Sequence, residues 1–232
     1  MASNTHIIEP NVQELIENFE RCLGIYIKWP AFNKPGQLDF HSRTIKLRRS
    51  AGSATNALKN DDFLWSLYET LRAWGMDSQG ANRSPYPEFK NELQSKTNLI
   101  ADLDGLRLDD PQLDIQNISS KLWQIMKSLK INQDNTKLVA CSKALHHLLP
   151  DLVVPIDRTY TGVFFNKDNY AFQFAQEKFL SLAMDNFAII ARAVNPAKFV
   201  VDRGWNTCLT KVIDNAIVGY REAQKRNIHF IK

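Results

Sequence analysis

Asp157 is the residue whose type and position could best do chemistry in this chain. It follows an apolar stretch, residues 152–156, at a point where a new helix is expected to begin. An aspartate at a helix start ordinarily caps it, here by accepting hydrogen bonds from the amides of Thr159 and Tyr160. The same amides and the helix dipole favour a negative charge. One geometry could therefore serve both a cap and the working carboxylate of an active site.

Other polar side chains near this position invite weaker predictions. Lys143 could act as an amine nucleophile if burial lowered its pKa, although contact with solvent or phosphate is the favoured interpretation. His146 and His147 are adjacent, so their side chains point about 100° apart on a helix. Neither has a companion at a metal-binding spacing, and both are expected to be packed or surface histidines. Arg158 is placed to pair with Asp157 or with a phosphate.

The elements that must position these residues show a helical period throughout. Phe63, Leu67 and Leu71 lie on one helical face, and Leu15, Phe19 and Leu23 lie on another, which Gly24 is expected to end. Residues 25–49 contain Pro30, Pro35 and Gly36, so an irregular or weakly extended segment is expected there, with a short sheet near 38–48 as an alternative. Helices are predicted over about 10–23, 61–74, 88–100, 112–130, 136–149, 158–166, 171–194 and 205–226.

These patterns predict an all-α protein of eight or nine helices. Its 232 residues are treated as a single domain, 1–232, in two helical lobes, with an irregular basic segment at about 25–60. The net charge is +4, and Arg43, Lys46, Arg48 and Arg49 form a local basic cluster, as do Lys225 and Arg226. Such clusters suit a phosphate backbone, although a solvated face is commoner.

Composition also predicts the compartment and the absence of bound groups. Three cysteines lie far apart, without zinc or iron–sulfur spacing. We therefore expect a reduced, cytoplasmic, monomeric protein without metal or organic cofactor. No signal sequence or bilayer-spanning run is evident, so no membrane association is expected.

The order of elements resembles the helix-hairpin-helix DNA glycosylase superfamily. The resemblance rests on Val154-Pro155-Ile156-Asp157 after a helix, on Ser142-Lys143-Ala144 near the family's lysine position, and on the upstream helix DDFLWSLYETLRAWG. It covers roughly residues 60–220. It extends to a divergent bacterial branch that includes an antiphage glycosylase acting on modified cytosines in viral DNA.

The resemblance implies an enzyme that flips a damaged or modified base out of double-stranded DNA and hydrolyses its N-glycosidic bond. Asp157 would stabilise the oxocarbenium-like sugar and orient water. The base pocket would be formed by Trp74, Met76, Gln79, Asn82 and Tyr160. DNA contacts would come from Lys137, Ser142, His146, Arg158, Arg203 and Lys211.

Two departures from the family limit what is carried over. The expected glycine-rich hairpin is replaced by DNTKLVACS, which has no glycine to let backbone amides approach a phosphate. The spacing between Lys143 and Asp157 is shorter than in lysine-using members, so a monofunctional hydrolase is favoured over a lyase. The alternative functions are a non-catalytic helix-hairpin-helix DNA-binding module and, third, a helical protein-interaction domain.

Overall fold

The computed structural model describes residues 9–76, 83–132 and 137–230. These residues form helices and connections, with no strand among them beyond one isolated bridge between Arg83 and Asn132. The predicted all-α class is confirmed. Within the described ranges the helices are α1 (Pro10–Glu17), α2 (Phe19–Lys28), α3 (Gln37–Ser50), α4 (Ala54–Lys59), α5 (Asp61–Ala73), α6 (Tyr86–Ser95), α7 (Thr97–Ala101), α8 (Ile115–Ser128), α9 (Lys137–Leu148), the π-helical turn η1 (Arg158–Gly162), α10 (Asn169–Gln173), α11 (Gln176–Val194), the 3₁₀ turn η2 (Pro196–Phe199) and α12 (Leu209–Lys225).

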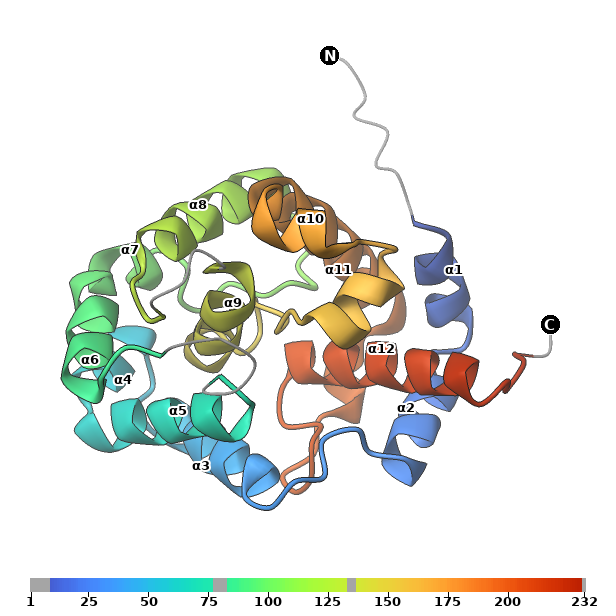
Figure 1. The fold of residues 1–232 in the computed structure, drawn as a ribbon, viewed down its shortest axis with the longest axis horizontal. Coiled ribbons are helices and arrows are strands. Elements are labelled where there is room, and N and C mark those ends of the chain that lie inside the picture. Colours follow the sequence, from blue (N-terminus) through green and yellow to red (C-terminus); the bar gives the residue numbers. More distant parts are fainter. Residues whose placement is uncertain (1–8, 77–82, 133–136, 231–232) are drawn as a thin grey trace, which may run out of the picture.

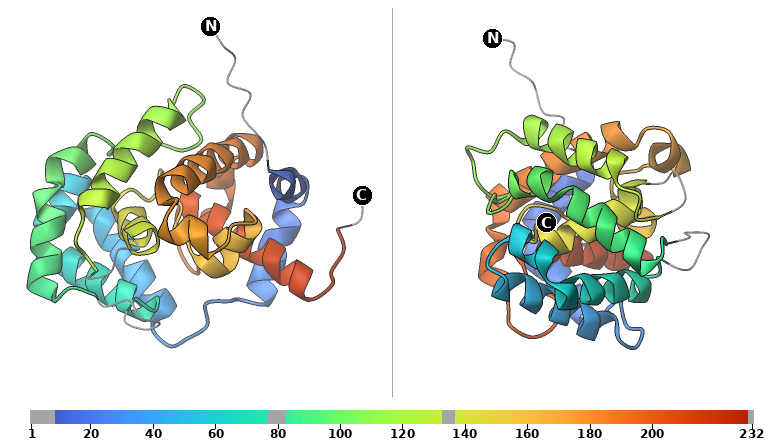
Figure 2. Two further views of the ribbon diagram at one scale, coloured as in Figure 1. Left: turned by 45° about the horizontal axis from the view of Figure 1, so that its top comes forward. Right: turned by 90° about the vertical axis from the view of Figure 1, so that its left-hand side faces the viewer.

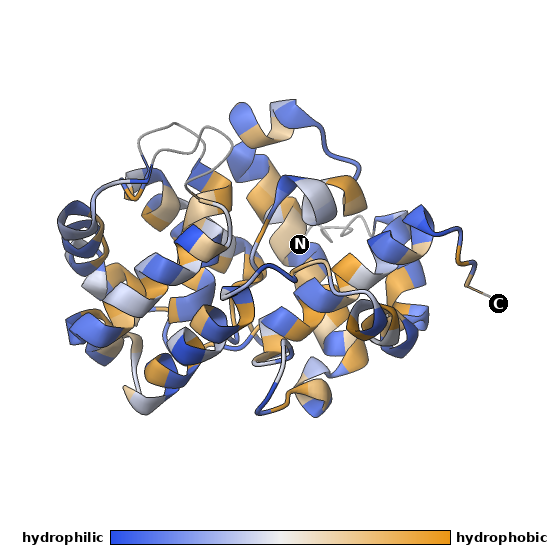
Figure 3. Ribbon diagram, turned by 60° about the horizontal axis from the view of Figure 1, so that its bottom comes forward, coloured by the Kyte–Doolittle hydropathy of each residue, from blue (hydrophilic) through white to orange (hydrophobic). Residues whose placement is uncertain are grey.

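Helix α9 occupies the centre of the molecule. Helices α3 to α8 lie on one side of it, while α1, α2, α10, α11 and α12 lie on the other (Figures 1 and 2). On that second side α2, near the start of the described residues, packs along α12, near their end. Figure 3 shows hydrophobic and hydrophilic residues alternating around most helices, as expected for amphipathic helices that each bury one face.

Helix α12 is buried along almost its whole length, from Leu209 to Ala223. At Gly219 its backbone meets that of α2 so closely that an added Cβ would lie 1.9 Å from the carbonyl oxygen of Cys22. Only glycine, which lacks a Cβ, permits this approach. The contact joins the N-terminal and C-terminal helices directly.

The irregular segment expected over 25–49 is confined to residues 29–36, because residues 25–28 belong to α2 and residues 37–50 form α3. The buried face of α3 follows a helical spacing, but most of its members are polar: Gln37, His41, Thr44 and Arg48. Each finds a partner: Gln37 Nε2 donates to the Ala73 carbonyl at 2.9 Å, and Thr44 Oγ1 bonds Ser66 Oγ at 2.7 Å. A helix that buries hydrogen-bonded polar groups gives no apolar period, and the alternative of a sheet near 38–48 fails for the same reason.

Helix ends also differ from the predictions. The helix expected over 10–23 is two helices that break at Asn18, and Gly24 lies inside α2 rather than ending it. The cap of α5 is Asn60, whose side chain accepts from the Phe63 amide at 3.2 Å, while Asp61 and Asp62 lie in the first turn. Thr136, the first residue of the helix expected over 136–149, lies outside the described residues.

None of the described helices is long and apolar enough to cross a lipid bilayer.

Candidate functional site

Asp157 caps η1, as the sequence predicts. Its Oδ1 accepts from the Tyr160 amide at 2.7 Å, and its own amide donates to Thr161 Oγ1 at 3.4 Å. The side chain is half-buried, whereas the five residues before it are buried. The carboxylate is therefore fixed in position and still partly accessible.

Ser142 of α9 anchors the connector that leads to Asp157. Its hydroxyl accepts from the Ile156 amide at 3.0 Å and donates to the Val139 carbonyl at 3.1 Å. Ser142 has no exposed surface. Its predicted contact with DNA is wrong, since the side chain is used to hold the connector against α9.

Four aromatic side chains gather beside Asp157, and we call them the aromatic cluster: Phe32, Trp74, Tyr160 and Trp205. The Phe32 ring is central, with ring centroids 6.4 Å from Trp74, 6.0 Å from Tyr160 and 5.7 Å from Trp205. All four keep some exposed surface. The structure thus brings together two predicted base-pocket residues, Trp74 and Tyr160, and adds two that the sequence analysis did not select.

Lys211 lies behind this cluster rather than at a DNA-facing surface. Its ammonium is 4.6 Å from the Phe32 ring centroid, 5.2 Å from that of Trp74 and 5.1 Å from that of Trp205. It also forms an ion pair with Asp214, one turn further along α12. With 1 % of its surface exposed, Lys211 cannot contact a phosphate, so its predicted role in DNA binding is wrong.

Two carboxylates, those of Asp157 and Asp214, interact with two ammonium groups, those of Lys143 and Lys211. Burial raises the pKa of Asp214, Lys211 opposes that rise, and the nearby Asp157 adds to it. Burial lowers the pKa of Lys143, while Asp157 and Asp214 raise it. Lys143 Nζ donates to the Trp74 carbonyl at 3.2 Å, at the edge of the aromatic cluster. The opposite charges nearly balance, which lets four ionisable groups occupy a largely buried region.

The remaining predicted residues are distributed more widely. Met76 is buried in the hydrophobic core, which argues against its role in a base pocket. Gln79 and Asn82 lie outside the described residues. Lys137 Nζ donates to the Asn132 carbonyl at 3.5 Å, Arg158 lies exposed 5.8 Å from the Phe172 ring centroid, and Arg203 is exposed.

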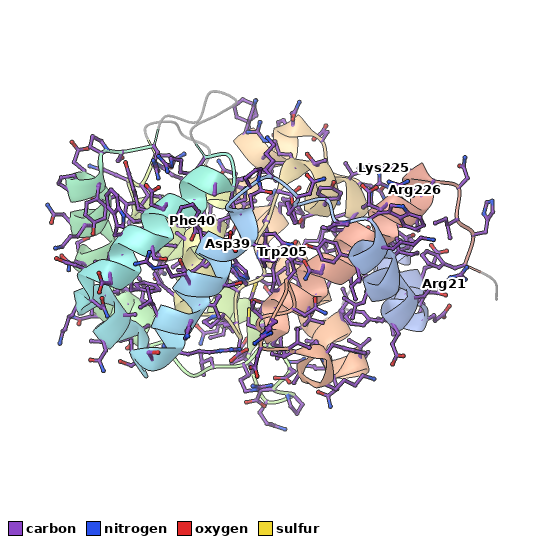
Figure 4. All side chains as sticks on the ribbon, turned by 90° about the horizontal axis from the view of Figure 1, so that it is seen from below. Arg21, Asp39, Phe40, Trp205, Lys225 and Arg226 are labelled. Carbon is purple, nitrogen blue, oxygen red and sulfur yellow. The ribbon has the colours of Figure 1, made fainter. Side chains whose placement is uncertain are left out.

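A basic and aromatic surface begins at Tyr160. We call it the basic surface, and it comprises Lys28, Trp29, Lys225 and Arg226. Lys225 Nζ lies 4.6 Å from the Tyr160 ring centroid, while Arg226 and Lys28 lie 4.6 Å and 4.4 Å from the Trp29 ring centroid. Figure 4 shows Trp205 between α3 and the α12 end that carries Lys225 and Arg226.

The other basic cluster of the sequence is partly structural. Arg48 donates to the Leu148 carbonyl at 2.7 Å and pairs with Asp104, and Arg49 donates to the Thr207 carbonyl. Arg43 and Lys46 are exposed on α3. The sequence could not show which charges are used internally: Lys225 and Arg226 also form ion pairs, with Glu222, but both remain exposed.

Three buried histidines pack directly behind Trp74. His41 Nδ1 is 2.9 Å from His147 Nε2, and the His41 ring stacks on that of His146 with a centroid separation of 5.8 Å. All three side chains have no exposed surface. The prediction that His146 contacts DNA is therefore wrong. His146 and His147 do have an imidazole companion, His41, which lies 106 residues before His147 in the sequence.

Burial lowers the pKa of all three rings, that of His147 to about 4. Unfolding restores a pKa near 6.5, so below that pH the unfolded chain binds more protons than the folded one. Stability is then fully present above about pH 6.5 and is lost as the pH falls toward 4. Each histidine contributes a slope of about 1.4 kcal/mol per pH unit.

This slope can be measured by urea unfolding between pH 7 and pH 5 in the presence of a chelator. We expect His147→Gln to reduce the average slope over this range by about 1 kcal/mol per pH unit, because near pH 7 the unfolded histidine is only partly protonated. His229→Gln, at an exposed position, should leave it unchanged. Equal slopes for the wild type and His147→Gln would contradict the assignment.

A surface pocket of about 450 Å³ lies elsewhere, lined by residues 16–21, 193–194 and 198–199. None of these residues belongs to the Asp157 region or to the basic surface. This pocket has no cluster of buried ionisable groups comparable with the one around Asp157, so we place the candidate site at Asp157.

No family model, curated protein or solved structure matches this chain. The case for a function therefore depends on the geometry of the described residues and on the sequence pattern around Asp157.

Proposed function

We propose that this protein is a DNA glycosylase that flips a damaged or modified base and hydrolyses its N-glycosidic bond. The observation that carries the proposal is the position of Asp157: a half-buried carboxylate, fixed by the Tyr160 amide and lying beside an aromatic cluster. A flipped base requires aromatic faces to stack on and polar groups to read its edge. Trp74 and Tyr160 would supply such faces.

An unsatisfied donor supports a binding role for this region. The buried indole Nε1 of Trp74 has no hydrogen-bond acceptor among the described residues. A buried polar group without a partner costs roughly 1–3 kcal/mol. A base carbonyl or ring nitrogen could accept this hydrogen bond, which would offset that cost on binding.

The chemical step uses Asp157 and a water molecule. The bond between C1′ and the base nitrogen breaks, the electron pair leaves with the base, and positive charge develops on the sugar. Asp157 stabilises that charge and orients the water whose oxygen bonds to C1′. One water proton passes to the carboxylate and from there to solvent, and the departing base takes up a proton. The products are a free base and an abasic site.

A monofunctional reaction is part of this proposal. Lys143 Nζ hydrogen-bonds the Trp74 carbonyl, and two carboxylates oppose the lowering of its pKa by burial. Both contacts favour the ammonium form, which is not a nucleophile. Borohydride treatment during the reaction should trap no covalent DNA adduct.

The arrangement of helices supports the finer fold assignment, a two-lobed helix-hairpin-helix glycosylase fold. Helices α8 and α9 pack together and would form the hairpin. The buried connector then leads from α9 to Asp157, in the order that the sequence resemblance implies. A monomer bound to double-stranded DNA is the proposed assembly.

The basic surface would contact the DNA backbone next to the flipped nucleotide. Replacing both Lys225 and Arg226 by glutamine should make the plot of log DNA-association constant against log salt concentration less steep by about 1 to 2. Each phosphate contact that is lost means that fewer counterions are released when DNA binds. Fluorescence anisotropy over a salt series measures this slope. The matched double variant Lys46→Gln/Lys59→Gln removes two exposed lysines of α3 and α4 and should change it little. An equal change in both variants would contradict the assigned surface.

The activity is tested by mass spectrometry of free bases released from a panel of DNAs. The panel includes uracil, alkylated, oxidised and mismatched bases and phage DNA with modified cytosines, which tests a role in defence. We expect one class of base to be released, with abasic sites in equal amount. Salt-sensitive DNA binding without release from any DNA would instead support the non-catalytic module, and absence of DNA binding would support a protein-interaction domain.

A further inference from the structure

The three buried histidines bring ring nitrogens together that could coordinate a metal ion. One ring nitrogen from each of His41, His146 and His147 lies within 4.8 Å of those of the other two. We propose that these three imidazoles bind a divalent transition metal of the zinc class. This proposal is independent of the glycosylase activity, which uses no metal.

The hydrogen bonds made by the other ring nitrogens fix two of the tautomers. His147 Nδ1 lies 2.8 Å from the Lys143 carbonyl, and His146 Nδ1 lies 2.9 Å from the Val153 carbonyl. A carbonyl can only accept, so both Nδ1 atoms carry the proton and both Nε2 atoms carry a lone pair. Metal-binding histidines typically donate their remote N–H to a carbonyl or carboxylate in this way.

His146 supplies a second, independent observation that points to a ligand. Its Nε2 is buried and has no hydrogen-bond partner among the described residues. A buried lone pair without a donor is unfavourable, and a bound cation would satisfy it. The same nitrogen is the one that its tautomer leaves available for coordination.

His41 completes the set through a change of tautomer. Without metal, His41 Nδ1–H donates to His147 Nε2 at 2.9 Å, and His41 Nε2 accepts from Thr207 Oγ1 at 2.7 Å. On metal binding the His41 proton moves from Nδ1 to Nε2. The Thr207 hydroxyl then rotates so that its oxygen accepts a hydrogen bond from His41 Nε2–H. Both Nδ1 of His41 and Nε2 of His147 then face the metal, and no net proton is released.

The separations are compatible with such a site. Zinc–nitrogen bonds of about 2.0–2.1 Å place tetrahedral ligand nitrogens about 3.3 Å apart. His41 Nδ1 and His147 Nε2, 2.9 Å apart, are already near this value, and one nitrogen of each of the three rings lies within 4.8 Å of one nitrogen of each other ring. The nearby Lys211 ammonium would repel a cation, but its ion pair with Asp214 offsets that charge.

A bound metal would link α3 to α9 and hold the inner side of the aromatic cluster. Trp74 packs against all three rings, with centroid separations of 5.2 Å to His41, 6.1 Å to His146 and 5.0 Å to His147. Fixing these rings fixes the position of the tryptophan. We therefore expect the metal to act as a structural element.

The test measures metal binding directly on the full chain. Protein stripped with a chelator is dialysed against Zn²⁺ or Co²⁺, and the metal content is determined by inductively coupled plasma mass spectrometry. We expect one equivalent of zinc, visible d–d absorption typical of tetrahedral coordination for cobalt, and a higher melting temperature with zinc. His146→Gln should weaken zinc affinity at least about 100-fold, and Thr207→Val, which removes the partner of His41, about 10- to 100-fold.

Controls separate this site from adventitious binding. His229→Gln alters an exposed histidine outside the cluster and should retain one equivalent and the cobalt spectrum. If the wild type takes up no zinc, or if His146→Gln binds it as tightly as His229→Gln does, the proposal is overturned. Should His146→Gln fail to fold, the folded wild type and Thr207→Val still decide the result through the cobalt spectrum and zinc affinity.

Discussion

Asp157→Asn is expected to reduce base release by at least about 100-fold, while folding and DNA affinity are retained. The asparagine side-chain carbonyl can still accept from the Tyr160 amide, so the cap of η1 persists. In the proposed mechanism the substitution removes the negative charge that would stabilise the sugar cation and the carboxylate that would accept a proton from water. Single-turnover release of the free base measures the effect, with circular dichroism and anisotropy to confirm folding and binding.

Asp168→Asn is the matched control. Asp168 also caps a helix, accepting from the Tyr170 amide at 3.0 Å and the Ala171 amide at 3.3 Å, but it is exposed at α10 and is not part of the charged group around Asp157. The same chemical change there should leave the rate within a factor of about two, since exposed substitutions away from a site have small effects. Undiminished release by Asp157→Asn would remove Asp157 from the mechanism.

Gly219→Ala should cause the largest loss of stability, more than about 3 kcal/mol, with loss of folding as the extreme outcome. The new Cβ would lie 1.9 Å from the carbonyl oxygen and 2.8 Å from the carbonyl carbon of Cys22. These are backbone atoms of α2, so no side chain can rotate away. The two helices would have to separate, which would disrupt the packing of α2 against α12. Urea unfolding followed by circular dichroism gives the free energy of unfolding.

Gly24→Ala makes the same substitution in the partner helix and should have the opposite sign. Gly24 lies inside α2, and nothing is within 4 Å of the position of its Cβ. Alanine there should stabilise the protein by about 0.5–1 kcal/mol, because it lowers the entropy of the unfolded chain and favours the helix. If both variants lose similar stability, the close approach at Gly219 does not have the effect that we assign to it.

Much of the helical framework could be predicted because its signals are local. In α5 and α8 the apolar residues recur with the helical period, so these helices were found with end errors of a few residues, whereas the helix expected over 171–194 is divided into α10 and α11. The cap at Asp157 was also predicted, since a polar side chain after an apolar connector and before a helix bonds to amides only a few residues away.

The candidate site was recovered only in part. Asp157, Lys143, Trp74 and Tyr160 were selected and do lie together, but Phe32 and Trp205 were missed because each lies in a connection without a pattern. Lys211 was expected at the DNA, and the fold instead buries it against Asp214. The i,i+3 spacing of Lys211 and Asp214 is compatible with an ion pair, but the sequence does not show whether that pair lies at the surface or inside the fold.

By itself, then, the sequence determined the all-α class, most amphipathic helices and the cap at Asp157, because each depends on residues within a turn or two of one another. Only the tertiary structure decided that α3 is a helix with a polar buried face, that His41 meets His147, and that Gly219 touches Cys22. In these cases the partners lie far apart in the chain. Burying a polar group or bringing two backbones together is favourable only once those partners are in place.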